Sequence, residues 1–214
     1  MEHTPERPDS PRRQRSAKRR NEILRAATDI FGARGYRNGS LGEIADKVGI
    51  THAGILHHFG SKNQLLLEVL DYRDRVDDVE DLEGRHPPEG MPLFRHLVET
   101  ARRNTARPGI VQTYAVLSAD SVTDNHPAQD YFRDRFTGLR AMIAASLKQV
   151  CDPDDMPPDS DVDTAASAII AVMDGLQVQW LLDDVNVDLP YATAFAIDAI
   201  LAALVARRTG DRLR

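Results

Sequence analysis

Apolar residues recur along this chain with the spacing of helices, and the strict alternation of a half-buried strand is missing. Stripes of this kind mark three short segments in the first part of the chain, near residues 17–35, 41–48 and 52–59. In order, the stripes consist of Ile23, Leu24, Ala27, Ile30 and Phe31, of Leu41, Ile44, Ala45 and Val48, and of Ile55 and Phe59. Each stripe predicts an amphipathic helix that turns one face toward a shared core.

Polar caps and glycines predict where these helices begin and end. Ser40 and Glu43 have the S-x-x-E spacing of a capping box, in which each side chain accepts a hydrogen bond from the backbone N–H of the other residue. Thr51 is placed to cap the third helix. Gly35 and Gly49 are expected to end the first and second helices, because glycine tolerates the backbone turn that stops a helix.

The second and third segments together predict a helix-turn-helix. Both are short, a tight turn at Gly49 joins them, and the small Ala45 four residues earlier lets the two helices cross closely. In such a motif the second helix enters the major groove of double-stranded DNA. Residues 51–54, at the start of that helix, would then lie nearest the bases.

The rest of the chain also has the pattern of helices, so we predict an all-α fold of about nine helices. Clusters of proline and glycine interrupt the chain, and the intervals between them have the length of helices. Six helices are expected near residues 62–82, 92–105, 108–121, 127–150, 161–184 and 190–207. Ser61 is placed to cap the first of them.

Positive charge is concentrated at the beginning of an acidic protein. The formal net charge is −6, yet residues 11–62 hold eleven Lys or Arg against four Asp or Glu, a local balance of +7, so the remainder carries −13. This asymmetry is typical of a polyanion-binding module attached to a separate body. We therefore predict a disordered basic arm (1–16), rich in Pro, Arg and Ser, a helix-turn-helix DNA-binding domain (17–62) and a larger helical domain (63–214).

Composition restricts the compartment in which the protein acts. The 214 residues, 42% of them hydrophobic, suffice for a substantial core, and a single cysteine, Cys151, excludes an intramolecular disulfide. The N-terminus lacks the apolar segment of a signal peptide. No later apolar run approaches the roughly 20 residues of a membrane span. These features predict a cytoplasmic protein without membrane contact.

Residues 51–62, THAGILHHFGSK, gather three histidines and a lysine and leave several roles open. Zinc prefers histidines four residues apart or nearby cysteines, whereas His52, His57 and His58 lie five, six and one residues apart. Catalysis would require an oriented acid or nucleophile, and none can be named. Either His57 or His58 can pack against a neighbouring helix, and both, with Lys62, can donate hydrogen bonds to DNA phosphates.

Residues 19–70 resemble the N-terminal DNA-binding domain of the TetR family of bacterial transcriptional regulators. The resemblance lies in the pattern I-L-x-A-A-x-x-x-F-x-x-x-G-Y, in the run S-L-x-E-I-A-x-x-V-G-I, and in HHFGSK before an apolar helix. It implies DNA contacts by Ser40, Thr51, His52, Ala53, Gly54, His57, His58 and Lys62. Many family members have tyrosine where this chain has Leu56, so that contact is absent or replaced here.

The same resemblance implies that residues 63–214 bind an effector and form a homodimer through the last two helices. Two stripes suit close helix pairing: Ala165, Ala168, Ile169, Val172 and Leu176 on one helix, and Ala192, Ala196, Ala199 and Ala203 on the other. The effector pocket is expected among large side chains of the central helices that include polar groups. The candidates are Phe94, Tyr114, Leu117, Phe132, Phe136, Met173, Gln177 and Trp180.

The prediction is a TetR-like transcriptional regulator, a repressor released from a palindromic DNA operator by a small-molecule effector. No metal, cofactor or enzymatic activity is expected, because no nucleophile motif, phosphate loop or metal-ligand set is found. The alternative is a constitutive or architectural DNA-binding protein whose body is packed solid and takes no effector.

Overall fold

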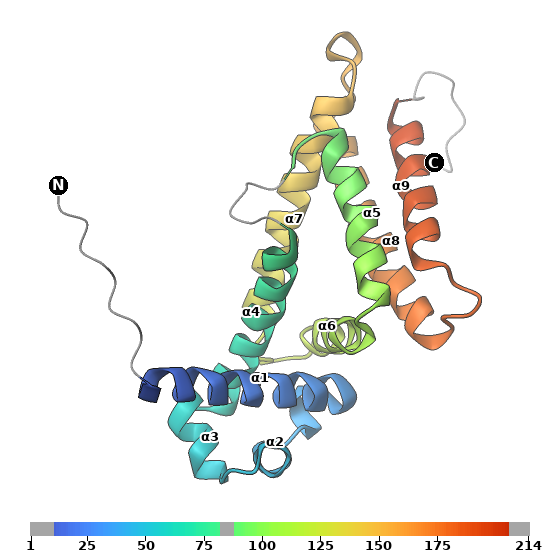
Figure 1. The fold of residues 1–214 in the computed structure, drawn as a ribbon. Helices are drawn as coiled ribbons and strands as arrows, with labels where there is room; N and C mark the ends of the chain where they lie inside the picture. Colours follow the sequence, from blue (N-terminus) through green and yellow to red (C-terminus); the bar gives the residue numbers. More distant parts are fainter. Residues whose placement is uncertain (1–10, 82–87, 206–214) are drawn as a thin grey trace, which may run out of the picture.

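The computed structural model describes residues 11–81 and 88–205, and these ranges are helical without a strand. Nine α-helices and one short 3₁₀ helix, η1, occur in them (Figure 1). The helices are α1 (Pro11–Asn38), α2 (Leu41–Val48), α3 (His52–Phe59), α4 (Lys62–Asp81), α5 (Met91–Thr105), α6 (Pro108–Asp120), α7 (Gln129–Val150), η1 (Pro153–Asp155), α8 (Asp159–Leu182) and α9 (Leu189–Val205). The predicted all-α class is confirmed, and the predicted ends of α2 to α9 lie within two residues of the observed ones, except that the ends predicted at residues 82 and 207 lie outside the described residues.

The first helix is longer than its apolar stripe predicts. It begins at Pro11, so the predicted disorder of the arm is wrong for residues 11–16, while residues 1–10 lie outside the described ranges. Proline suits the first helical position, where its missing N–H is not needed, and the arginines and glutamine that follow favour helix. The prediction failed because helix propensity extends α1 beyond its packed face.

Gly35 breaks α1 and does not end it. Its backbone has φ 71° and ψ 173°, and helical structure resumes up to Asn38. The side chain of Asp120, at the end of α6, accepts a hydrogen bond from the N–H of Tyr36 (3.0 Å). The N–H next to this break is therefore bound by the end of α6, and the break forms a junction between α1 and α6.

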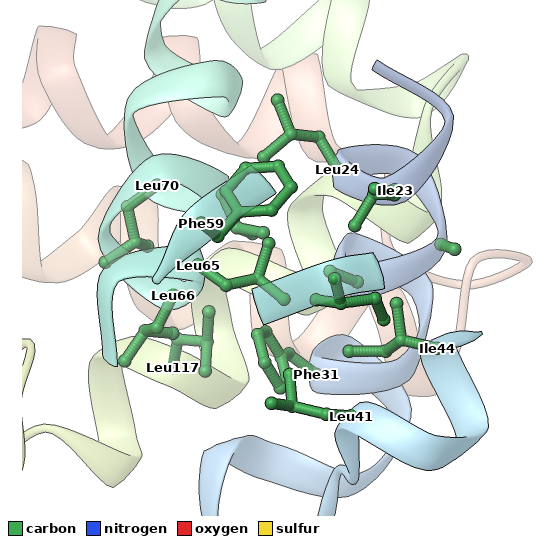
Figure 2. Close-up of a cluster of buried hydrophobic side chains, with 14 of the residues drawn as sticks. Ile23, Leu24, Phe31, Leu41, Ile44, Phe59, Leu65, Leu66, Leu70 and Leu117 are labelled. Atoms are coloured by element: carbon green, nitrogen blue, oxygen red, sulfur yellow. The ribbon is translucent and has the colours of Figure 1, made fainter. Parts of the chain in front are cut away.

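The first three helices form a head, with α2 and α3 packed beneath α1 (Figure 1). Apolar residues of α1, α2 and α3 converge with those of α4 in one buried cluster (Figure 2). Ile23, Phe31, Ile44 and Ile55 are each 0% exposed. The predicted stripes thus face a common core, with the partly buried Ile30 and Val48 at its margin.

The head core continues into the rest of the molecule. Leu65 and Leu70 of α4 belong to the same cluster, as do Leu117 of α6 and Phe132 of α7. In α1, Gly32 lies so close to Thr113 of α6 that a Cβ would overlap its hydroxyl, and that hydroxyl donates to the Thr28 carbonyl (3.0 Å). Packing therefore continues past the predicted domain boundary at residue 62.

Helices α5 to α9 form the body, which stands on α1 (Figure 1). Within the described residues, α8 is the one helix that is long and apolar enough, by length and composition, to cross a membrane. The expectation that no apolar run reaches this length is therefore wrong for α8. The helix buries Val162, Ile169 and Trp180 against its neighbours and carries Asp174, as a core helix of the body does.

Replacement of Gly35 by alanine is expected to destabilise the protein by about 1–3 kcal/mol, because residues other than glycine are strained at positive φ. The added Cβ would also overlap the Asp120 carboxylate that binds the Tyr36 N–H. Urea unfolding measures the change in free energy. Gly138→Ala is the matched control: this exposed glycine of α7 has open space, and alanine there should stabilise the helix slightly. Equal stability of Gly35→Ala and the wild type would contradict a strained junction.

Candidate nucleic-acid interface

The outer face of α3 is free of packing contacts at the positions that would meet DNA. Ile55 and Phe59 are turned inward, 0% and 4% exposed, whereas His52, Ala53 and His57 are exposed and Leu56 is 37% exposed. This division follows from the helical period, since Ile55 and Phe59 are one turn apart. The outer face thus consists of small, apolar and imidazole side chains.

The N-terminus of α3 is capped as predicted. The Thr51 side chain accepts a hydrogen bond from the Gly54 N–H (3.1 Å). A helix N-terminus favours anions, because its first N–H groups have no partner within the helix. The start of α3 therefore combines small side chains, which permit close approach, with an electrostatic preference for phosphate.

The two adjacent histidines of α3 differ in their surroundings. His57 is exposed, whereas His58 is half-buried and its ring lies against Phe59. Burial, with help from the neighbouring His57 and Arg20, lowers the pKa of His58. His58 is thus the more strongly packed of the pair, and His57 is the one with a freely accessible ring.

Ser40 caps α2 through the predicted capping box. Its hydroxyl accepts from the Glu43 N–H (3.0 Å), and the Glu43 carboxylate accepts from the Ser40 N–H (3.3 Å). Arg34 of α1 forms an ion pair with Glu43 (2.6 Å). Ser40 remains exposed beside this network, so its hydroxyl is accessible at the edge of the head.

Lys62 ties α4 to the end of α1. Its ammonium donates to the Arg37 carbonyl (3.2 Å) and lies 4.5 Å from the centre of the Tyr36 ring. Partial burial lowers the pKa of Lys62. Because an ammonium has three N–H donors, the side chain can hold α1 and still offer a donor to a phosphate.

Several of the basic residues counted in the sequence hold the head together. Arg20 lies 4.3 Å from the Phe59 ring centre, donates to the His58 carbonyl (3.2 Å), and forms an ion pair with Glu68 of α4. Lys47 pairs with Asp29 across α2 and α1 (2.6 Å). Some of the basic residues therefore stabilise the packing of the head. These ion pairs join charges that are already counted in the local balance of +7, so the region stays positively charged.

Metal ligands do not gather here. In the ranges 11–81 and 88–205, no three residues of the types His, Cys, Asp or Glu are grouped so that they could hold a metal ion. Of the three histidines in residues 51–62, His57 and His58 lie side by side with ring centres 5.8 Å apart, and His52 lies at the start of α3.

The body contains a central cavity of about 110 Å³ between α4, α5, α6, α7 and α8. Three of the predicted pocket residues line it: Tyr114, Met173 and Gln177. The other five do not. Leu117, Phe132 and Phe136 pack in or against the core shared with the head, while Phe94 and Trp180 lie in two further apolar clusters.

Charged residues line the same cavity, and the sequence analysis missed them. Arg73 of α4, Arg135 of α7 and Asp174 of α8 face it. Asp74 bridges the two guanidinium groups, accepting from Arg73 (3.0 Å) and Arg135 (2.9 Å), and also accepts from the Tyr131 hydroxyl. Both guanidinium groups lie over the Tyr114 ring, 4.3 and 5.4 Å from its centre.

The spacing of Arg73 and Asp174 along their helices indicates that both belong to buried faces. Arg73 continues the buried stripe of Leu66 and Leu70 at offsets 0, 4 and 7, and Asp174 lies four residues after Ile170 and three before Gln177. A charged residue on an apolar face marks a buried polar site. Periodicity could thus have indicated Arg73 and Asp174, although not the pairing of Arg73 with Arg135.

Helices α8 and α9 present an apolar surface to solvent. Val178 and Leu182 of α8 are 45% and 84% exposed, Val185 in the connection to α9 is 88% exposed, and Tyr191 and Phe195 of α9 are 71% and 67% exposed. Ala199 and Ala203, at the far end of the predicted small-residue stripe, are exposed on α9 as well. Large exposed apolar groups gathered on two adjacent helices are typical of a protein–protein interface.

A capped recognition helix on a basic three-helix head, joined to a helical body with an internal cavity, defines a helix-turn-helix DNA-binding protein. Residues 23–69 match the family described as bacterial regulatory proteins of the tetR family, and residues 94–206 match the C-terminal domain of BetI-type transcriptional repressors. The chain is 32% identical over 158 residues to the transcriptional repressor KstR2 of Mycobacterium tuberculosis, covering 68% of this chain and 72% of the relative. The chain belongs to the TetR family of bacterial transcriptional regulators.

Solved structures share this fold. NalD, the secondary repressor of the MexAB-OprM multidrug efflux pump in Pseudomonas aeruginosa, superposes with a TM-score of 0.67 at 20% identity, over 92% of this chain and all of NalD (100%). A transcriptional regulator from Saccharomonospora viridis, solved in complex with choline, has a TM-score of 0.64 at 24% identity, over 86% and 96% of the two chains. With the family assignment, the protein is a DNA-binding transcriptional regulator with the architecture of the repressors it resembles.

Proposed function

We propose that the protein is a dimeric cytoplasmic repressor that binds a palindromic operator and is released by a small molecule bound in its central cavity. The observation that carries this proposal is the exposed outer face of α3, capped at Thr51 and supported by a core that continues into the cavity-bearing body. The protein acts by binding and not by catalysis.

In the proposed complex each residue of the head has a distinct part. Small side chains at Ala53 and Gly54 let the start of α3 approach the base edges, while His52 and Thr51 offer donors and acceptors there. His57, Ser40 and Lys62 bind phosphates and fix the orientation of α3. His58 serves mainly to pack α3 against the head, because its ring is half-buried.

Dimerisation uses the exposed apolar surface of α8 and α9 and sets two heads on successive major grooves. A helix-turn-helix dimer reads two half-sites about 34 Å apart, so the symmetry of the protein requires a palindrome. The pairing of α8 and α9 with their counterparts also covers Leu182 and Phe195, which are largely exposed in the single chain.

The effector acts by preferring one spacing of the heads over another. A ligand that binds both arrangements with equal affinity does not change the equilibrium between them. The shape of the cavity must therefore differ between the two arrangements. Arg73 lines the cavity on α4, and α4 begins at Lys62, which holds the end of α1. The choline complex of the S. viridis neighbour supports a small-molecule site in a body of this fold.

Selection of randomised duplex DNA by the purified protein tests the proposal. We expect an enriched palindrome, with an affinity that falls by roughly a thousandfold between 50 and 200 mM salt. His57→Ala should weaken binding, because a hydrogen bond to a phosphate is lost. Arg133→Ala, at an exposed position of α7, serves as the control for loss of a hydrogen-bonding surface side chain outside the head. Binding without sequence enrichment would indicate an architectural role instead.

A further inference from the structure

Two adjoining hollows meet at three residues. The central cavity of about 110 Å³ and an outer hollow of about 300 Å³ between α6 and α8 are both lined by Tyr114, Asp174 and Gln177. Asp174 and Gln177 lie one turn apart on α8, so both side chains project on the same side of the helix. The remaining wall of the central cavity combines apolar residues, among them Leu97, Ile170 and Met173, with the guanidinium groups of Arg73 and Arg135.

The two cations of the cavity share one carboxylate as a hydrogen-bond partner, whereas the second carboxylate, Asp174, is attracted by their charge without a hydrogen bond to either. Asp74 bridges Arg73 and Arg135. Among the residues that the structure describes, no side chain or backbone group donates a hydrogen bond to Asp174 or forms an ion pair with it. Gln177, which is 7% exposed, likewise has no hydrogen-bond partner in those ranges. The Asp174 carboxylate is partly exposed and the Gln177 carboxamide is buried, so both present oxygen acceptors that a ligand in the cavity can engage.

Electrostatics at this site disfavour two classes of ligand. An anion would meet the Asp174 carboxylate in the cavity wall and the Asp74 carboxylate that bridges both guanidinium groups, so two negative charges oppose it. A quaternary ammonium has no N–H to donate, and it is usually held over the face of an aromatic ring. The Tyr114 ring is already approached by Arg73 and Arg135.

We propose that the cavity binds a primary or secondary ammonium that carries an apolar body, and that this class of molecule is the effector of the regulator proposed above. The ammonium donates to the Asp174 carboxylate and to the Gln177 side-chain oxygen. The apolar body lies along Leu97, Ile170 and Met173. The charge of the ammonium and its N–H donors make the site specific for this end of the ligand. Burial of the apolar body provides the rest of the binding free energy.

Four probes of equal chain length test the charge and the donors separately: n-hexylamine, hexan-1-ol, hexanoate and hexyltrimethylammonium. In calorimetric titrations of the full-length protein at pH 7.5, we expect hexylamine to bind at least about tenfold more tightly than each of the others. Asp174→Asn should abolish the preference for hexylamine over hexanol. Asp163→Asn, at an exposed position of the same helix, removes the same charge and should leave the preference unchanged.

The affinity for hexylamine should also depend on pH. Burial raises the pKa of Asp174 to about 6, against the opposing influence of Arg73 and Arg135. The charged or titratable groups that face Asp174 in the cavity are Arg73 of α4, Tyr114 of α6 and Arg135 of α7, while α5 contributes only uncharged residues. Since the ammonium binds the ionised carboxylate, affinity should rise about tenfold from pH 5 to pH 8 in the wild type and stay flat in Asp174→Asn.

Equal affinity for hexylamine and hexanol, a preference for hexanoate, or an undiminished amine preference in Asp174→Asn would overturn the proposal. Operator selection separates this outcome from failure of the proposed function. An enriched palindrome without amine binding leaves the regulator and removes only the ammonium effector. Amine binding by a folded protein that selects no operator would support the ammonium site and contradict the proposed repressor function.

Discussion

Ala53→Glu is expected to lower the operator affinity of the dimer by about a hundredfold or more without unfolding the head. Ala53 is exposed near the start of α3, where the side chain is closest to the floor of the major groove. A glutamate there is too large for close approach and adds a negative charge beside the phosphates. A loss of about 1.4 kcal/mol of binding free energy in each head weakens binding about tenfold per head. The two heads of the dimer together therefore lose about a hundredfold in affinity.

Fluorescence anisotropy with the selected operator measures this loss, and circular dichroism confirms that the helices remain. Ala141→Glu is the matched control, because Ala141 is an exposed helical alanine of α7 and the charge changes by the same amount. Retention of full operator affinity by Ala53→Glu would show that the start of α3 does not enter the groove.

Replacement of both Leu182 and Phe195 by glutamate is expected to convert the dimer into a folded monomer. These side chains are 84% and 67% exposed on α8 and α9, so glutamate is accommodated in the single chain but would be buried without a cation in the proposed interface. A monomer must bind each half-site independently, which lowers the affinity for the full operator by about 10²–10⁴-fold.

Sedimentation velocity gives the mass in solution, and titration with full and half operators gives the affinity. Met156→Glu provides the comparison, since Met156 is an apolar residue 44% exposed in the segment between α7 and α8, outside the α8–α9 surface. A dimer that persists in the double variant would place the interface elsewhere on the body.

Leu56 stands on α3 at the position where the family resemblance leads us to expect tyrosine. It is 37% exposed between the inward face of Ile55 and Phe59 and the outward His57. An aliphatic side chain cannot donate to a phosphate, but it can contact the methyl group of a thymine. The operator sequence from the selection experiment will show whether a thymine is preferred opposite this position.

Helix ends and the inward faces of the head were determined locally and could be read from the sequence. The capping box of Ser40 and Glu43, the Thr51 cap and the αL turn at Gly49 are formed by residues at most a few positions apart. The apolar stripes follow the helical period. These signals act within one or two turns of chain, so the helix-turn-helix could be predicted without knowledge of the rest of the molecule.

The sequence was less informative about the limits of α1 and about the cavity. Helix propensity without an apolar stripe extends α1 back to Pro11, and Gly35 is held as a break because Asp120 of α6 binds the next N–H. Neither effect is visible in periodicity. Most of the aromatic residues predicted to form the pocket pack in the cores, because burial of large apolar side chains is favourable wherever helices meet.

The sequence by itself determined which segments are helices, how the head is capped, and which face of each helix is apolar. Only the tertiary structure decided which apolar faces meet each other and which meet solvent. In the folded chain Arg73 and Arg135, which are 62 positions apart in the sequence, both donate hydrogen bonds to Asp74. Asp174 receives no hydrogen bond from the described residues. The physical reason is that helix formation depends on neighbours along the chain, whereas a polar site inside a helical body depends on crossing geometry that no single helix encodes.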